Sequence, residues 1–231
     1  MRSSILFHVS GIFLSALAAL ASPALAQETS VREFVTRIRP DGFQFNEAVE
    51  IAKPSDVPAL LEMLRDPSMA RYRPNIVLTL GAVGDPAAKD PLLELVKNPG
   101  SLTPPATFRD QTEATKALGY LLNKTNDAEI LNFLVARAKM DVAAATGGLA
   151  ASMSPSQQQM ARVAILALGL SGTDQARSAL SSMSTRVQAA IGPGGPSPSE
   201  EGVDDVVSQA LKDNREIKQE GLEKYYAPAT R

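Results

Sequence analysis

The sequence contains no cysteine, no tryptophan and a single histidine, His8, in 231 residues. Without cysteine the chain has no disulfide, no thiol nucleophile and no cysteine ligand for zinc or haem. His8 lies in a predicted leader peptide, so the mature chain also has no imidazole for a catalytic triad or a metal site. We therefore expect a protein that holds no cofactor and no metal ion.

Neither sign of charge dominates, because 23 basic and 25 acidic side chains leave a net charge of −2 at pH 7. Proteins that bind nucleic acid usually carry a basic excess, which displaces counterions from the phosphates. We expect no nucleic-acid partner. Hydrophobic residues make up 44% of the chain, which is typical of a globular protein rather than a disordered or fibrous one.

The longest apolar run lies at the N-terminus. Arg2 precedes an apolar stretch over about residues 9–21, and Ala24 and Ala26 form a small-x-small cleavage pattern. The run is short for a bilayer core of about 30 Å. We predict a signal peptide that is cleaved after Ala26, export to the periplasm or the medium, and no integral membrane segment afterwards. An uncleaved N-terminal anchor is the alternative.

A short phrase recurs three times in the mature chain, each time with a Leu-Gly pair late in an apolar helical pattern. The pairs are Leu80-Gly81, Leu118-Gly119 and Leu168-Gly169. The glycine of each pair is expected to permit close approach of a neighbouring helix and to start the exit turn. Each phrase is followed by a turn rich in Gly, Asn or Asp and then by a second amphipathic segment, so the unit is helix, turn, helix. The segments that follow the three phrases are predicted at 86–97, 127–140 and 173–184, and helices are also predicted at 45–52 and 56–65.

Residues 56–184 resemble HEAT repeats, in particular the short HEAT-like repeats of phycobilisome lyases. The matching residues are Leu60-Leu-Glu-Met-Leu64-Arg-Asp-Pro67, Arg73, and Leu80-Gly81-x-x-Gly84-Asp85-Pro86 with Leu92-Leu93 after it. The second and third units have Gln111 and Ala161 where the first has arginine. The resemblance implies an all-α superhelix of about four helical pairs that recognises another protein, and an arginine at position 73 that supports neighbouring loops. It does not imply lyase activity, because nothing in the sequence suggests a pigment site.

The chain is expected to divide into a leader (1–26), N-terminal capping helices (27–54), a HEAT-like repeat domain (55–191), a flexible Gly/Pro/Ser linker (192–200) and a C-terminal amphipathic helix with a tail (201–231).

One helical pair cannot enclose its own apolar face, so neighbouring pairs are expected to share a core. The second helix of each pair is the one that carries the Leu-Gly phrase. The predicted core stripe of these second helices is Tyr72, Ile76, Leu80 and Val83; Ala114, Ala117, Leu118 and Leu121; and Met160, Ala164, Ala167 and Leu168.

Connections between the predicted pairs are short, and connections within the pairs are long. The long ones are 98–106, about 142–156, and 192–199. Because alternate turns of a solenoid emerge at opposite edges, the three insertions are expected at one edge. Long loops are often functional or mobile; both alternatives stay open for 192–199, and packing against the repeats is favoured for 142–153.

Two of the second helices are apolar nearly all round, through Leu78 and Ala82 in the first unit and Ile165, Leu166 and Leu170 in the third. Such helices are expected to be buried on more than one side. The cover is predicted to be the adjacent first helices, the Ala-rich insertion, or a partner protein in the concave groove.

No nucleophile-elbow, phosphate-loop, dinucleotide-binding or calcium-loop motif occurs after the leader, and we therefore predict that the protein is not an enzyme. Basic and aromatic side chains that suit an interface or an acidic ligand form the candidate binding set. These residues are Arg65, Arg71, Arg73, Arg109, Lys116, Tyr120 and Arg162. The alternative is a solvated surface, with Asp66 and Glu62 neutralising the arginines of the first unit.

These observations predict an exported helical-repeat scaffold that binds an unidentified protein through its concave face and the insertion-bearing edge. A small-ligand-binding protein or a carboxylate-dependent enzyme of the cell envelope is the alternative, and a purely structural role in an envelope assembly is a third. Asn123-Lys-Thr125 is also a formal glycosylation triplet.

Overall fold

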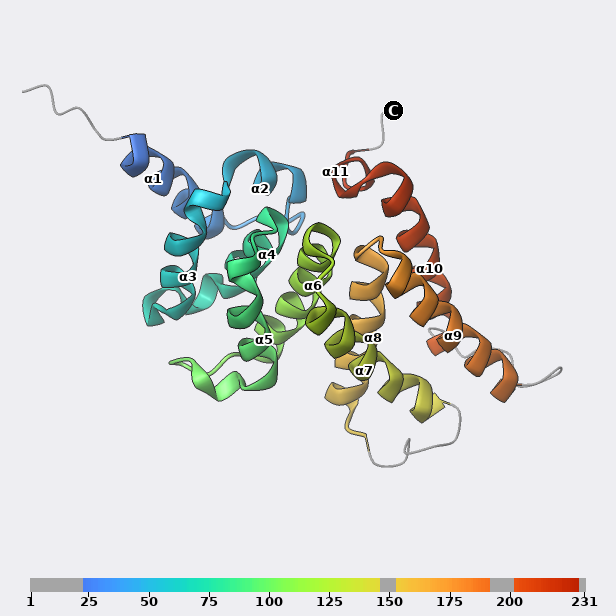
Figure 1. Cartoon of the computed structure of the whole chain (residues 1–231). Coiled ribbons are helices and arrows are strands. Elements are labelled where there is room, and N and C mark those ends of the chain that lie inside the picture. The colour runs from blue at the N-terminus through green and yellow to red at the C-terminus, as the bar shows by residue number, and fades with distance from the viewer. Residues whose placement is uncertain (1–22, 146–152, 192–201, 229–231) are drawn as a thin grey trace, which may run out of the picture.

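The computed structural model describes residues 23–145, 153–191 and 202–228. All regular secondary structure in these ranges is helical, which confirms the predicted all-α class (Figure 1). The α-helices are α1 (Pro23–Thr36), α2 (Phe45–Ile51), α3 (Val57–Arg65), α4 (Arg73–Val83), α5 (Lys89–Lys97), α6 (Phe108–Thr125), α7 (Ala128–Ala145), α8 (Pro155–Leu170), α9 (Asp174–Ile191), α10 (Val203–Glu220) and α11 (Leu222–Tyr225). Short 3-10 helices span Pro54–Asp56, Pro67–Tyr72, Pro86–Ala88 and Pro99–Ser101.

Several predicted segments lie wholly or mostly outside the described residues, namely the leader, the linker at 192–200 and the centre of the insertion at 142–156. α1 begins at Pro23 and runs through the predicted cleavage position. α7 extends to Ala145 and α9 to Ile191, so the predicted helix ends at 140 and 184 are too early. Val142 consequently belongs to a helix and not to a loop.

Local signals in the sequence explain where the helices start and stop. Thr107 and Asp110 cap the start of α6 reciprocally: each side chain accepts a hydrogen bond from the other residue's backbone N–H, at 3.1 and 2.8 Å. Ser154 begins α8 in the same way, with Gln157 as its partner. α4 ends at Gly84, whose φ of +76° lies in the left-handed region that glycine adopts without strain.

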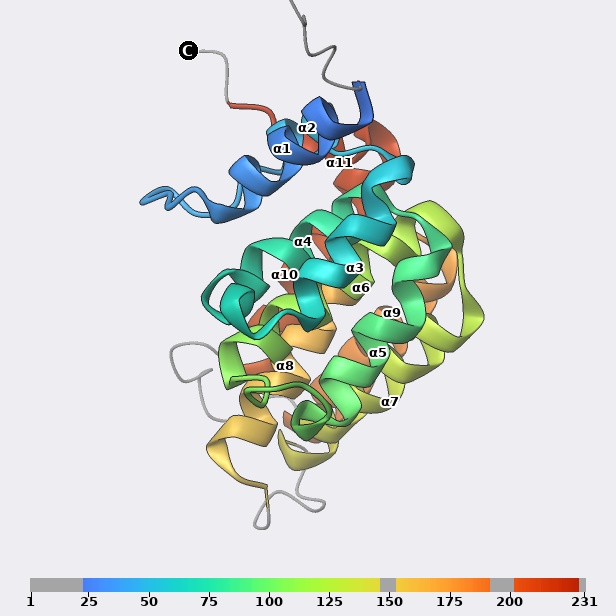
Figure 2. The same cartoon turned by 90° about the vertical axis from the view of Figure 1, so that its left-hand side faces the viewer.

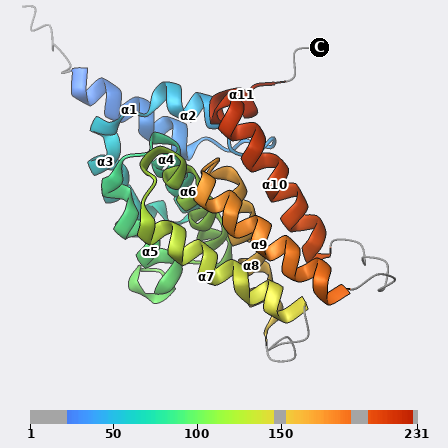
Figure 3. The same cartoon turned by 45° about the vertical axis from the view of Figure 1, so that its right-hand side comes forward.

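The helices pack in successive pairs. α3 lies against α4, α5 against α6, α7 against α8, and α9 against α10. The second helices also form a row of their own, in which α4 packs on α6, α6 on α8, and α8 on α10 (Figure 1). Figure 2 views this row from the side of α3, so that the pairs overlap, and Figure 3 shows α9 packed beside α7.

The three Leu-Gly sites occupy equivalent positions in this row. A Cβ added at Gly81 would lie 2.6 Å from Cα of Ala117 in the next helix, and one added at Gly119 would lie 2.5 Å from the carbonyl oxygen of Ala167. Gly169 stands in the same relation to Ala210 of α10, at 2.9 Å. The predicted role of these glycines in close helix approach is confirmed. They do not all start an exit turn, however, because Gly119 lies well inside α6.

The core follows the predicted stripe. All of its members are buried except Tyr72 and Val83, which are half-buried. α1 and α2 pack against α4, and neither helix was among the predicted covers. This packing makes the N-terminal helices part of the same packed body, with Phe34 and Phe45 buried in the shared core.

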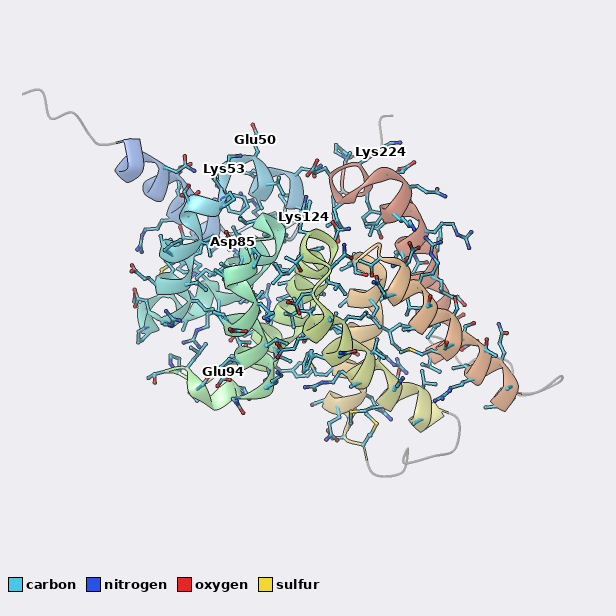
Figure 4. All side chains as sticks on the ribbon, viewed as in Figure 1. Glu50, Lys53, Asp85, Glu94, Lys124 and Lys224 are labelled. Carbon is cyan, nitrogen blue, oxygen red and sulfur yellow. The ribbon has the colours of Figure 1, made fainter. Side chains whose placement is uncertain are left out.

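The turns between pairs contact one another along one edge. Lys124 lies against Gly84, and the Asn123 side chain donates a hydrogen bond to the carbonyl oxygen of Ser171 at 2.8 Å. Figure 4 shows Asp85 and Lys124 at this edge, above Glu94 in the view, and Glu94 at the opposite edge. The insertion at 98–106 follows α5 and therefore belongs to the Glu94 edge. The other two insertions were predicted at this edge as well, but residues 146–152 and 192–201 lie outside the description.

Candidate ligand-binding groove

A groove with a volume of about 530 Å³ runs along one face of α6. The helix contributes Arg109, Glu113, Lys116 and Tyr120 to its wall. These positions are spaced by four, three and four residues, which places them in one stripe along a helix. From Arg109 to Tyr120 the axis rises about 16 Å, at 1.5 Å per residue.

The other walls come from segments that are distant in the sequence. The apolar floor consists of Leu78 from α4 and of Leu166 and Leu170 from α8. The remaining lining residues are Arg37, Ile38, Arg39, Gly42 and Phe43 between α1 and α2; Arg71, Tyr72, Pro74 and Asn75 around the start of α4; and Asp213 and Tyr226 near the C-terminus. The groove is thus cationic at its rim and apolar at its base.

Four of the seven predicted binding residues line this groove together: Arg71, Arg109, Lys116 and Tyr120. The other three do not. Arg65 is exposed and lines a separate cleft of about 380 Å³ between α3, α5 and the insertion at 98–106. Arg162 lies on α8 with its Nε 3.5 Å from a carboxylate oxygen of Asp141 on α7.

Arg73 is not a surface residue. It is only 1% exposed, and its guanidinium donates hydrogen bonds to the carbonyl oxygens of Pro104 at 2.6 Å and Thr103 at 3.0 Å. Its placement in the binding set is therefore corrected, and the loop-supporting role implied by the resemblance is confirmed. The bonds hold the turn that carries Arg71 beside the segment that leads to Arg109.

Among the described residues, Arg71 and Arg109 of the groove have no acidic partner. In the part of the chain that the structure describes, neither Arg71 nor Arg109 forms an ion pair; the Arg71 guanidinium lies 4.9 Å from the centre of the Tyr72 ring. Among the described residues neither Asp66 nor Glu62 forms an ion pair with these arginines, and the Asp66 carboxylate accepts a hydrogen bond from the Ser68 N–H at 2.8 Å. Hydrogen bonding to Ser68 lowers the pKa of Asp66.

The other cations of the groove are paired. Arg37 and Arg39 each lie 2.9 Å from a carboxylate oxygen of Glu47. Lys116 lies 3.0 Å from Glu113, one turn away on α6. The unpaired positive charge of the groove is therefore concentrated at its Arg71 and Arg109 end.

An aromatic cluster forms the other end of the stripe. The hydroxyl groups of Tyr120 and Tyr226 are 2.8 Å apart, and the Phe45 ring centre lies 5.0 Å from that of each tyrosine. Burial is the main cause that raises the pKa of both Tyr120 and Tyr226 above the ordinary value of 10.0. These hydroxyls therefore stay protonated over the physiological range.

Sequence reasoning missed several lining residues. Glu113 was within reach, since it shares the helical stripe of Arg109, Lys116 and Tyr120. Thr112, the residue before Glu113, does not line the groove and donates its hydroxyl to the Phe108 carbonyl oxygen at 2.9 Å. No pattern in the sequence indicates that Ile38 and Tyr226 line the groove, because they lie outside the repeats and enter the groove only through tertiary packing.

The glycosylation triplet has a structural role. The Asn123 amide donates to Ser171 and lies 3.3 Å from where a Cβ at Gly172 would stand. A glycan on this nitrogen would disrupt the contact between the two turns.

Within the described ranges, no cluster of three or more histidine, cysteine, aspartate or glutamate side chains is placed to hold a metal ion. No helix in these ranges combines the length and the apolarity that crossing a membrane requires. Comparisons with models of known protein families, with curated proteins and with solved structures found no match.

Proposed function

We propose that this chain is an exported, non-enzymatic protein of HEAT-like helical pairs, which binds a segment of another protein in the groove along α6. The solenoid reading is supported by the equivalent packing of the three glycines, each against an alanine of the next helix in the row. The observation that carries the binding proposal is the convergence of Arg71, Arg109, Lys116 and Tyr120 in one groove.

The composition of the groove favours a protein partner. Arginine and tyrosine are enriched at protein interfaces, where they supply both apolar area and hydrogen bonds. Ile38 lines the rim and is 77% exposed, although large aliphatic side chains are usually buried. An exposed isoleucine among arginines offers a partner one apolar and several polar contacts at the same place.

The test is site-specific photo-crosslinking in cells that make the protein. A benzophenone amino acid replaces Ile38 at the groove or, as the control, Lys139, an exposed residue on α7 that lines a different cleft. A discrete adduct with another protein is expected from position 38 and not from position 139. The adduct should come from the exported fraction, and its chain should begin at Gln27.

The absence of an adduct at position 38, or equal labelling from both positions, would contradict the proposal. An adduct found only on chains that retain residues 1–26 would contradict the export part of it.

A small-ligand-binding protein is the second candidate, because the volume of about 530 Å³ lies within the range of ordinary ligand pockets. A thermal-shift screen distinguishes the two candidates: a metabolite that raises the melting temperature with occupancy would favour this one. The carboxylates of the groove give less support to an enzyme. Glu113 is paired with Lys116, and Asp213 accepts a hydrogen bond from Gln209 at 2.6 Å.

A further inference from the structure

We infer that the partner segment that occupies the groove is an extended acidic peptide with aliphatic side chains, bound through carboxylate contacts to Arg71 and Arg109. This inference rests on the proposed function and narrows it to one class of ligand.

The positive charge of the groove favours a ligand that carries carboxylates. Arg71 and Arg109 are both exposed, line the same groove and have no ion pair among the described residues. A guanidinium group binds carboxylate in a bidentate geometry that adds both strength and direction. Arg73 positions the two groups, because its hydrogen bonds tie their two segments together.

The apolar floor of the groove favours a peptide over a phosphate-containing ligand. Leu78, Leu166 and Leu170 form an apolar strip that a phosphate backbone or an inorganic anion cannot use. Glu113 and Asp213 line the same groove and would repel a continuous run of phosphates. A peptide that carries both carboxylates and aliphatic side chains satisfies the arginines and the floor together, whereas a nucleic acid or a lipid headgroup satisfies only the arginines.

The length of the groove sets the number of peptide residues that it can hold. The stripe on α6 is about 16 Å long, and an extended chain advances about 3.3 Å per residue. The groove therefore spans about five residues of peptide. Tyr120 is held by Tyr226 at one end and the free arginines lie at the other, so the acidic residues are expected at the arginine end of the bound segment.

The test uses a displayed library of random heptapeptides, panned on the exported chain. Selected peptides are expected to be enriched in aspartate, glutamate and aliphatic residues. Their affinity, measured by fluorescence polarisation, should fall about tenfold or more in R71E/R109E, because the charge-assisted hydrogen bonds of both guanidinium groups are lost. The matched control K139E/R186E changes two exposed cations of a different cleft and should leave the affinity unchanged.

R71Q/R109Q, which removes the charges without reversing them, should also weaken binding, and both variants should melt within a few degrees of the unaltered chain. Recovery of no binding peptide, of peptides without acidic enrichment, or of peptides that bind R71E/R109E equally well would overturn the inference. Binding to phosphatidylglycerol vesicles that is lost in the same variant would overturn it in favour of a lipid surface.

Crosslinking separates this inference from the proposed function. If the adduct at position 38 persists in R71E/R109E, the protein-binding function stands and the acidic ligand is wrong. If position 38 labels only the chain itself or a second copy of it, both fail.

Discussion

At the scale of single residues, two buried charges differ in how well their surroundings satisfy them. Arg73 donates to two carbonyl oxygens. Asp141 is 4% exposed, and its Oδ2 atom lies 3.5 Å from Nε of Arg162 without forming a hydrogen bond. Burial raises the pKa of Asp141, and the attraction of Arg162 offsets this only in part. Arg73 therefore contributes to the structure, whereas ionised Asp141 is a cost to it.

This difference predicts the effect of D141N. A carboxyl group whose folded-state pKa is raised destabilises the protein as the pH rises from the unfolded value of 3.8 through the folded value. At pH 7, well above the unfolded value, D141N should raise the free energy of unfolding, because the neutral amide removes the desolvation of a buried carboxylate. At pH 3 it should have no effect. Urea unfolding at both pH values measures this.

The control is D90N, at an exposed carboxylate of α5, which should leave stability unchanged. A loss of stability in D141N at pH 7 would show that the contact with Arg162 outweighs the cost of burial.

At the scale of elements, the distance between neighbouring second helices is set by glycine. Gly81, Gly119 and Gly169 each leave room for the backbone of the next helix. Alanine there would have a better intrinsic helix propensity by about 1 kcal/mol. The absence of a side chain is favoured only because the interface leaves no space for one.

The variants G81A, G119A and G169A are expected to lose about 1–3 kcal/mol of unfolding free energy, the usual cost of overpacking a core. G100A is the matched control, because nothing lies within 4 Å of a Cβ at Gly100; it should stay within about 0.5 kcal/mol of the original. Denaturant unfolding with an unchanged m-value is the measurement. Equal stability of G119A and G100A would refute the close contact between α6 and α8.

At the scale of the whole molecule, α2 from the N-terminal part of the chain meets α11 from the C-terminal part (Figures 1 and 3). α2 and α11 lie side by side (Figures 1 and 3), and the Asn46 side chain donates to the Glu223 carbonyl oxygen at 3.0 Å. Phe45 stacks on Tyr226, and Tyr226 bonds to Tyr120 in the central helix α6. The N-terminal and C-terminal elements thus stabilise each other and close one end of the groove.

The variant Y226F keeps the ring and removes the hydroxyl bond to Tyr120, so it should cost about 1 kcal/mol. When the folded-state pKa of a tyrosine is raised, the folded protein becomes less stable as the pH rises above the unfolded value of 10.0, because the unfolded chain releases the proton more readily. The stability of the original protein should therefore fall above pH 10, and less steeply in Y226F. Guanidinium unfolding at pH 8 and pH 10.5 measures both effects.

Y72F is the control, because the Tyr72 hydroxyl forms no hydrogen bond among the described residues. An unchanged alkaline slope in Y226F would show that Tyr226 is not buried against Tyr120 in solution.

The sequence alone predicted the helical class, the starts of α2, α3, α7 and α9 to within one residue, and the pairing of the helices, because these depend on local patterns: the 3.6-residue apolar period, capping residues and glycine turns. It also predicted the packing role of the repeated glycines. The same local logic misplaced the ends of α7 and α9, where polar or small residues continue a helix that packing stabilises.

The groove depended on tertiary structure. The cations of α6 were predicted from sequence, but whether Arg71 joins them while Arg73 turns inward depends on where the 98–106 insertion lies. Ile38 and Tyr226 reach the groove only because the segment between α1 and α2 and the residues after α11 lie beside the row of second helices. Periodicity reports which face of a helix is apolar. It carries no information about which distant segment covers that face, because that choice depends on contacts between residues far apart in the chain.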